Sequence, residues 1–248
     1  MLWACLLCLA ISASLAQPVQ VYSEFARVND AGGVTAPEDP REILSPLAPR
    51  NAFTSFQLVI QLSPGTKFSL FAGQNPDDAA KITMYRRVAG ALEPIVLPFD
   101  GDSTQIFWMD VHVAKTSPVR RVKIEPQVLI GGDWTIYPME VRVVEATVPD
   151  TQPTVSGSDA YSILLNGLCH PDTPASNTNT NFATQLAVRN ARQDLALVAG
   201  LNPEGREALF KVAGLKLAGG CNAKPPANPE FYLKIRDSLL RQTSKTMP

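Results

Sequence analysis

The sequence predicts a mainly β protein, an antiparallel β-sandwich of the immunoglobulin or fibronectin type with a small C-terminal helical region. Short alternating or apolar runs recur between residues 18 and 149, separated by Gly, Pro and Asp turns, as in sheets packed face to face. The 248 residues include 21 prolines and only 18% charged residues, which favours a loop-rich β protein. A closed barrel is the alternative architecture for the same strands.

About eight short strands are expected from these runs. The segment 105–113 alternates most clearly, with Trp108, Asp110 and His112 on one face and apolar residues on the other. Pro126 interrupts one run and suits an edge or a bulge, where a missing N–H costs little. The expected strands are 19–25, 53–62, 68–71, 82–87, 95–97, 105–113, 119–130 and 134–148.

Beyond a polar linker at 151–160, the hydrophobic period changes from that of strands to that of helices. The region 161–248 therefore predicts three helices, at 181–199, 202–213 and 228–240. The second has the clearest boundaries, because Asn202 is a good N-cap, Pro203 suits the first turn and Gly214 suits the C-terminal end. The sandwich domain is expected to occupy residues 17–150.

The first sixteen residues are typical of an export signal, with an apolar run followed by small residues and a cleavage point after Ala16. They lack a basic residue before the apolar run, and the alternative is a buried N-terminal helix. The mature chain is then expected to be secreted or periplasmic, with no transmembrane segment after signal removal.

Two cysteines follow the expected signal, Cys169 and Cys221, whereas Cys5 and Cys8 fall within it. In an oxidising compartment an isolated pair favours a disulfide, and closing such a loop stabilises by roughly 4 kcal/mol. Two free buried thiols are the alternative. Cys169 and the adjacent His170 lack the further ligands of a zinc site, so no metal and no cofactor are predicted.

Three passages of the β region carry a family resemblance. They are Arg50-Asn51 followed by SFQLV at 55–59, the strand WMDVHV at 108–113, and the segment 141–150 that ends in Val-Pro-Asp. Together they resemble the N-terminal β-sandwich domain that precedes the catalytic barrel in glycoside hydrolase family 123 and its bacterial relatives. The resemblance covers roughly residues 20–150 and implies an accessory domain of a carbohydrate-related protein.

The sequence also departs from that family in two places. Ala52 stands where the family has a glutamate, and the family's Gly-x-Tyr-x-Gly stretch is missing around 118–123. The acid pair of the family lies in a (β/α)₈ barrel, and 98 residues follow Asp150, whereas such a barrel needs about 200 or more. The resemblance therefore implies the accessory domain without the enzyme.

Four aromatic residues of the β region are candidates for ligand binding, because large rings form platforms on which sugars stack. The alternative is that they are core residues or cross-strand pairs. The four candidates are Tyr85, Trp108, Trp134 and Tyr137.

Two pairs of polar residues are candidates for reactive or metal-binding groups. Asp110 and His112 share a strand face and suit acid–base chemistry, although such residues more often lie on a solvated face. Asp100 and Asp102 suit calcium, but the spacing of a calcium loop is absent, which favours a turn. No catalytic residue is therefore assigned from the sequence.

Three hypotheses for function remain open. The preferred one is an exported, non-catalytic interaction module with a glycan or another surface protein as partner. The second is a hydrolase related to glycoside hydrolases, and the third is a structural or assembly protein. The net charge of −1 argues against nucleic acid as a partner. The hydrolase would draw its acids from Asp100, Asp102, Asp110 and Glu140.

Overall fold

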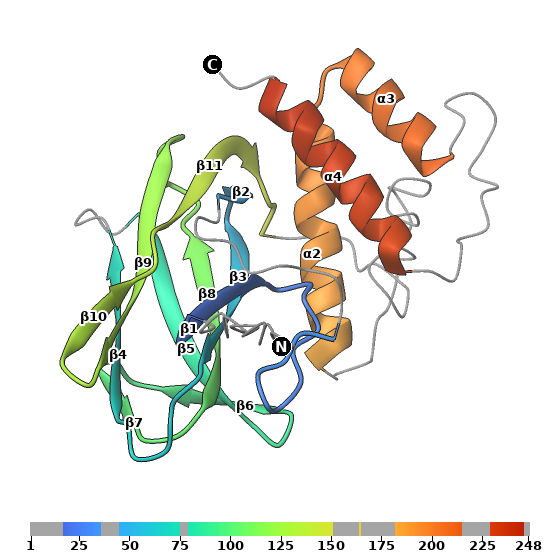
Figure 1. The fold of residues 1–248 in the computed structure, drawn as a ribbon. Coiled ribbons are helices and arrows are strands. Elements are labelled where there is room, and N and C mark those ends of the chain that lie inside the picture. The colour runs from blue at the N-terminus through green and yellow to red at the C-terminus, as the bar shows by residue number, and fades with distance from the viewer. Residues whose placement is uncertain are drawn as a thin grey trace, which may run out of the picture.

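The computed structural model describes residues 17–35, 45–74, 79–150, 164, 182–214 and 229–245. These residues form a mainly β body of two sheets and three helices that pack along one end of it (Figure 1). The strands are β1 (Val19–Ser23), β2 (Leu47–Arg50), β3 (Ala52–Ile60), β4 (Phe68–Gln74), β5 (Ala80–Val88), β6 (Ala91–Ile95), β7 (Phe99–Gly101), β8 (Gln105–Val113), β9 (Arg121–Ile130), β10 (Asp133–Ile136) and β11 (Met139–Thr147). The helices are α2 (Phe182–Ala199), α3 (Pro203–Ala213) and α4 (Pro229–Lys245).

The strands lie in two separate sheets rather than in one closed barrel. The first sheet has the order β1-β3-β8-β5-β6 and is antiparallel throughout. The second has the order β2-β11-β9-β4-β7, with β10 paired to β9. The expectation of antiparallel sheets is wrong for one pair in the second sheet, because β2 runs parallel to β11. A connection of many residues separates these two strands, and parallel pairing needs such a connection.

The inner faces of both sheets share one apolar core. Strand β8 contributes Phe107, Met109, Val111 and Val113, which are at most 1% exposed, as the alternation of this strand predicts. Strands β4 and β9 supply Phe68 and Val128 from the opposite sheet. The ring of Phe107 contacts both Phe68 and Phe99 edge to face, at centroid distances of 6.0 and 5.5 Å.

Between β2 and β3 the chain crosses from the second sheet to the first, and the connection is the single residue Asn51. Its φ of 55° is left-handed, a conformation that Asn tolerates better than most residues. The Asn51 amide donates hydrogen bonds to the carbonyl of Val148 (2.8 Å) and the carboxylate of Asp150 (2.9 Å). Lys115 also contacts Asp150 and lowers the pKa of that carboxyl. This corner therefore joins the start of β3 to the end of β11.

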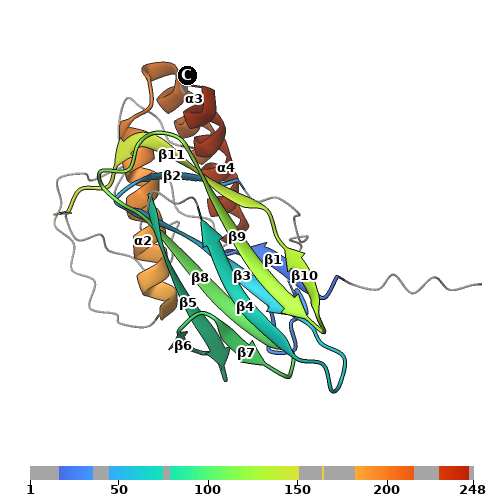
Figure 2. The same ribbon diagram turned by 90° about the vertical axis from the view of Figure 1, so that its left-hand side faces the viewer.

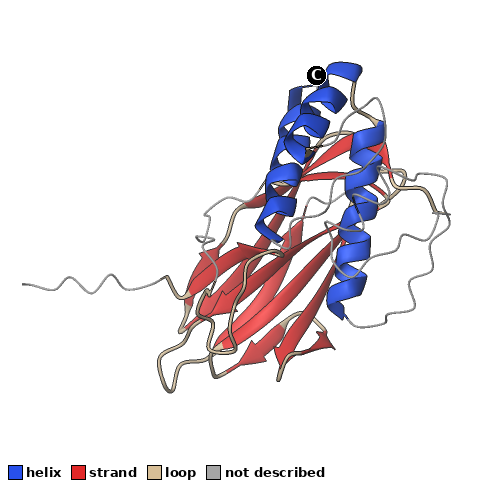
Figure 3. Ribbon diagram, turned by 90° about the vertical axis from the view of Figure 1, so that its right-hand side faces the viewer, coloured by secondary structure: helices blue, strands red, loops and turns tan. Residues whose placement is uncertain are grey.

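The boundaries expected for the second helix, α3, are confirmed. Asn202 caps α3 through a 2.8 Å bond from the Gly205 N–H, and Gly214 ends it with a φ of 69°. Helix α4 extends to Lys245, five residues beyond its expected end. The helices share an apolar cluster with β2 and β11, in which Leu209 and Leu239 are fully buried. Figures 2 and 3 show α2 lying against the two-sheet body, with α3 and α4 outside it.

Several sequence-based expectations fall outside the described residues. They are the signal at 1–16, the linker at 151–160 and the pair Cys169 and Cys221. The division into a β domain and a helical region also stays a prediction. None of the helices within the described ranges has the length and hydropathy of a membrane-spanning segment.

Candidate functional site

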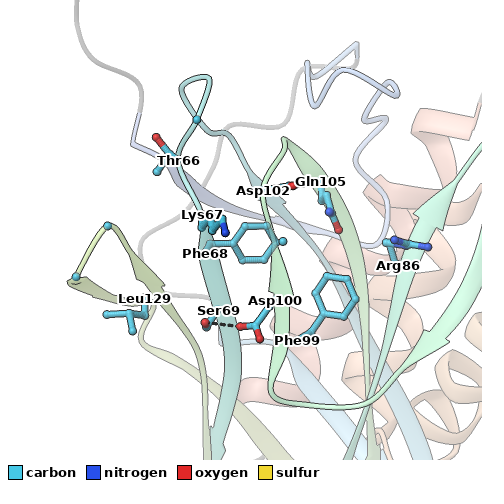
Figure 4. A pocket seen from close by; sticks show the side chains of 14 residues that line it. Thr66, Lys67, Phe68, Ser69, Arg86, Phe99, Asp100, Asp102, Gln105 and Leu129 are labelled. Carbon is cyan, nitrogen blue, oxygen red and sulfur yellow. Dashed lines mark hydrogen bonds between the residues drawn. The ribbon is translucent and has the colours of Figure 1, made fainter.

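An open pocket of about 960 Å³ lies at the end of the two-sheet body that is far from α3 and α4 (Figures 1 and 4). We call it the distal pocket. The loops that precede β4 and β8 and the β9–β10 turn bring its residues together from distant parts of the sequence. It is lined by Gly65, Thr66, Lys67, Phe68, Ser69, Arg86, Phe99, Asp100, Gly101, Asp102, Gln105, Leu129, Gly131 and Gly132.

The charged groups that line the distal pocket are two basic and two acidic side chains. Lys67 and Arg86 are the cations, and Asp100 and Asp102 are the carboxylates. Ser69 donates a 2.5 Å hydrogen bond to Asp100, which Figure 4 shows as a dashed line. The pocket therefore presents hydrogen-bond donors and acceptors side by side, with nearly balanced charge.

The wall around Arg86 combines polar and aromatic groups. Its guanidinium lies 5.9 Å from the centre of the Phe99 ring and forms a 2.9 Å ion pair with Glu93. Within the described residues, the Arg86 Nε and the Gln105 Oε1 are buried and have no hydrogen-bond partner. Buried polar groups in proteins are nearly always hydrogen-bonded, so these two atoms are free to bond a ligand in the pocket.

Glycines shape two parts of the pocket. Gly131 and Gly132 form the β9–β10 turn with φ values of 58° and 101°, which favour glycine. Gly101 lies so close to the Phe68 ring that a Cβ there would approach it to 2.3 Å. Glycine at position 101 therefore leaves room for the Phe68 ring in the pocket wall.

An exposed apolar patch adjoins the pocket on the outer face of the second sheet. We call Phe71, Leu129, Trp134 and Ile136 the Trp134 patch. Trp134 is 54% exposed and Ile136 is 51% exposed. The Trp134 ring packs against Phe71 at a centroid distance of 5.2 Å. Exposed apolar groups gathered in this way are typical of interaction surfaces.

The four aromatic residues expected to bind ligand do not form one platform. Tyr85 and Trp108 lie opposite each other on β5 and β8, and Trp108 is 7% exposed because it packs against Phe182 of α2. Tyr137 is buried in the core between the sheets. Trp134 alone of the four is widely exposed. Their role in ligand binding stays a prediction, and the geometry favours Trp134.

The outer face of the first sheet holds a polar cluster beneath α2 rather than a solvated surface, which corrects the expectation for Asp110. Arg189 of α2 donates to Glu24 (3.1 Å), to Ser55 (2.6 Å) and to Asp110 (3.3 Å). Ser55 also donates to Asp110, and Trp108 Nε1 donates to the same carboxylate at 2.7 Å. These contacts fasten α2 to β3 and β8.

His112 lies at the margin of this cluster and is partly covered. Its ring is 4.6 Å from that of Phe53, over which the Arg189 guanidinium lies at 5.2 Å. Burial, aided by the charge of Lys81, lowers the pKa of His112. Asp110 and His112 are therefore not exposed as an acid–base pair, since Asp110 is committed to Arg189, Ser55 and Trp108.

A second buried cluster joins α2 to α4. Asp194 is 0% exposed, accepts a 2.5 Å hydrogen bond from Tyr232, and forms a 3.1 Å ion pair with Arg236. The Arg236 guanidinium also lies 4.9 Å from the Phe25 ring. Burial raises the pKa of Asp194, and Arg236 and Tyr232 oppose that shift.

Glu24 is expected to make the protein more stable as the pH falls through mild acidity. Burial raises the pKa of Glu24, against the opposing effects of Arg189, Arg236 and Asn190. Because the folded state then binds a proton more readily than the unfolded state, the free energy of unfolding rises as pH falls from the folded pKa toward 4.5. Urea unfolding between about pH 7 and pH 5 measures this slope.

The comparison uses Glu24→Gln, which keeps the shape of the side chain and removes its titration. The stability of the wild type relative to this variant should increase toward acid, although His112, with its lowered pKa, favours unfolding below 6.5 in both proteins. A difference between the two proteins that stays constant with pH would contradict the assignment.

The four acids of the hydrolase hypothesis do not all lie together: two share the distal pocket and two lie elsewhere. Asp100 and Asp102 line the distal pocket, and Asp110 lies under α2. Glu140 accepts from Ser45 (2.5 Å) and from Arg121 (2.8 Å) on the second sheet. Among the residues that the structure describes, no group of three or more His, Cys, Asp and Glu side chains is arranged to hold a metal ion.

The motif residues of the family resemblance have structural contacts. Asn51 forms the corner between the sheets, and Gln57 donates to the carbonyls of Ser23 (3.1 Å) and Ala26 (2.7 Å). Ser55, together with Asp110, belongs to the cluster beneath α2. None of these four motif residues lines the distal pocket. The pocket residues Lys67, Arg86 and Gln105 have no motif of their own, and only the nearby glycine turns pointed to loops here.

Comparison with known proteins gives limited similarity. No family model matches the chain, and no curated protein matches it. A family 123 glycoside hydrolase from Clostridium perfringens shares 9% identity over 44% of this chain and 24% of that chain, with a TM-score of 0.33. A GH5 xyloglucanase from Bacteroides ovatus, in complex with a XXXG heptasaccharide, shares 12% identity over 50% of this chain and 23% of that chain, with a TM-score of 0.27.

The SrpA adhesin from Streptococcus sanguinis shares 10% identity over 70% of this chain and 77% of that chain, with a TM-score of 0.28. The chain therefore spans about a quarter of the two hydrolases. Similarity at this level is limited to β-rich folds, and it assigns neither a family nor a ligand.

Proposed function

We propose that the chain is an exported, non-catalytic binding module whose distal pocket takes a carbohydrate, in association with a cell surface. Its two-sheet body is, on this proposal, a β-sandwich of the immunoglobulin or fibronectin type, akin to the accessory domain that the sequence motifs resemble. The observation open to the structural or assembly hypothesis is the exposed Trp134 patch.

The observation that supports the proposal is the chemical mixture in the pocket wall. A sugar hydroxyl both donates and accepts hydrogen bonds, so it suits a wall where Lys67 and Arg86 donate while Asp100 and Asp102 accept. A few polar groups beside aromatic surface are what a small-molecule site needs for orientation and specificity. Phe99 supplies that aromatic surface.

The balance of charge points to an uncharged ligand. A strongly anionic ligand would meet Asp100 and Asp102, and a strongly cationic one would meet Lys67 and Arg86. Unpaired charge taken out of water costs binding free energy, so neither kind of ion matches this wall. A neutral polyhydroxylated molecule satisfies donors and acceptors alike.

A binding role without catalysis fits the positions of the acids. Glycoside hydrolysis needs two carboxylates facing each other across the scissile bond, with one of them protonated. Asp110 and Glu140 lie outside the pocket and are held by arginines. Asp100 lies in the pocket wall, where it accepts a hydrogen bond from Ser69.

The proposal predicts that the chain binds neutral glycans and that pocket variants lose this binding. Glycan-array screening followed by titration calorimetry on the best glycan measures it. Asp102→Asn and Lys67→Met are each expected to weaken binding by about tenfold or more, because each removes a charge-assisted hydrogen bond. Lys123→Met and Asp237→Asn are the matched controls, since both side chains are exposed and outside the pocket lining.

Failure against a broad set of neutral glycans would contradict the proposal. Equal affinity in the pocket variants and the controls would place the binding elsewhere. Release of new reducing ends from a bound glycan would contradict its non-catalytic part.

A further inference from the structure

The register of three strands places the residues of the Trp134 patch on one face of the second sheet. Trp134 of β10 lies opposite Leu129 of β9, which lies opposite Ser69 of β4. Opposed residues of paired strands point to the same face of a sheet. In the next row of this face, the outward residues are Ile136, Gln127 and Phe71.

The exposed Trp134 ring is held in place rather than free. It packs against Phe71 with an angle of 48° between the rings, and β10 is fixed to β9 by its full length of pairing. Gly73 leaves space for the neighbouring Gln127 side chain, since a Cβ there would lie 2.7 Å from the Gln127 Nε2. A fixed aromatic ring with an amide beside it suits stacking and hydrogen bonding together.

The patch and the distal pocket are continuous. Leu129 belongs to both, and Ser69, in the same row, also lines the pocket and bonds to Asp100. The turn residues Gly131 and Gly132, which line the pocket, directly precede β10. The pocket and the patch therefore share a margin, formed by Leu129 and Ser69.

The charges around the patch are compensated. Farther along β9, Lys123 pairs with Glu125 at 2.7 Å, and Arg121 pairs with Glu140 at 2.8 Å. Among the described residues, these two pairs compensate the charges of β9 beside the patch, and the exposed Asp133 precedes Trp134 on β10. A pyranose ring has an apolar C–H face and a rim of hydroxyl groups, which fit an exposed ring beside Gln127.

We infer that the Trp134 patch and the distal pocket form one extended site, so that the ligand is a neutral oligosaccharide chain rather than a single sugar. One sugar unit occupies the pocket, and a following unit stacks on Trp134. This inference rests on the proposed function and adds the length and direction of the ligand to it.

The test compares affinities for the best-binding glycan at increasing chain length, from the monosaccharide to the hexasaccharide. The wild type is expected to bind the longer chains about tenfold more tightly than the monosaccharide. Trp134→Ala should lose this gain, with unchanged monosaccharide affinity, whereas Trp134→Phe should retain most of it. Phe182→Ala is the matched control, since this ring is 50% exposed on a different surface.

The outcomes separate the inference from the proposed function. Equal affinity for short and long chains, or no effect of Trp134→Ala on the long chains, overturns the inference and leaves the pocket proposal standing. The same conclusion follows if Asp102→Asn loses binding while the affinity of the wild type does not depend on glycan length. Binding to no glycan at any length overturns both. Self-association or binding of a protein that Trp134→Ala abolishes assigns the patch to that partner and overturns the inference.

Discussion

Arg189→Met is expected to lower the free energy of unfolding by about 3–5 kcal/mol, because it leaves two buried carboxylates without their cation. Arg189 is the shared donor to Glu24 and Asp110, whose side chains are 4% and 15% exposed. Methionine keeps the apolar stem over Phe53, so the change isolates the lost charge and hydrogen bonds. Urea unfolding at neutral pH measures the loss.

Arg241→Met serves as the control for the same chemical change at the surface. Arg241 pairs with Asp237 one turn away at 2.7 Å, and its side chain is 65% exposed. Exposed pairs of this kind contribute about 0–1 kcal/mol. If Arg189→Met lost no more stability than Arg241→Met, the cluster beneath α2 would not be what fastens the helix to the sheet.

Phe107→Ala is expected to lower the free energy of unfolding by about 3–5 kcal/mol, through lost burial and the cavity left behind. Phe107 is 0% exposed and packs against Phe68 and Phe99 from the other sheet. Both partners line the distal pocket, so glycan affinity should fall with stability. Thermal unfolding and calorimetric binding on the same preparation test the two effects.

The control for this change is Phe182→Ala, which removes an equally large ring that is 50% exposed. It should cost much less stability, since little apolar surface leaves water there on folding. A loss for Phe107→Ala as small as that for Phe182→Ala would mean that the core relaxes around the missing ring. Unchanged glycan affinity in Phe107→Ala would show that the pocket does not depend on the packing behind it.

Strands with regular alternation could be predicted from the sequence, whereas β2, β6 and β7 could not; the strand expected at 95–97 overlaps β6 only at Ile95. Strand β8 follows the expected pattern from Gln105 to Val113. Strand β2 has only four residues, includes Pro49, and pairs parallel with a strand almost a hundred residues later. Strand β7 is the three-residue segment Phe99–Gly101, whose Asp-Gly sequence favours a turn.

The sequence of β8 could not predict that α2 covers the outer face of the first sheet. The face of Trp108, Asp110 and His112 looks solvated in sequence, since two of its three residues are polar. Its partner, Arg189, lies 79 residues beyond Asp110 on a separate helix. A local pattern states which side chains share a face, but not which distant element packs on that face.

The candidate site was predictable only in part. Trp134 could be selected as a large aromatic residue of a β region, and the structure exposes it beside the pocket. No sequence motif marks Lys67, Arg86 or Gln105 as site residues. They come from separate loops and strands that only the fold brings together. The Asp100 and Asp102 pair suggests a turn or a calcium site in the sequence, and the structure places both residues in the mixed polar wall of the pocket.

The way in which the chain joins the two sheets has a consequence for how the ligand enters. Two of the short links are Asn51, between β2 and β3, and the three-residue connection from β6 to β7, on the opposite side of the body. With such short tethers at both margins, the sheets cannot part or slide without breaking the core. The pocket is therefore preorganised: binding proceeds by adjustment of side chains, with little conformational entropy lost from the backbone.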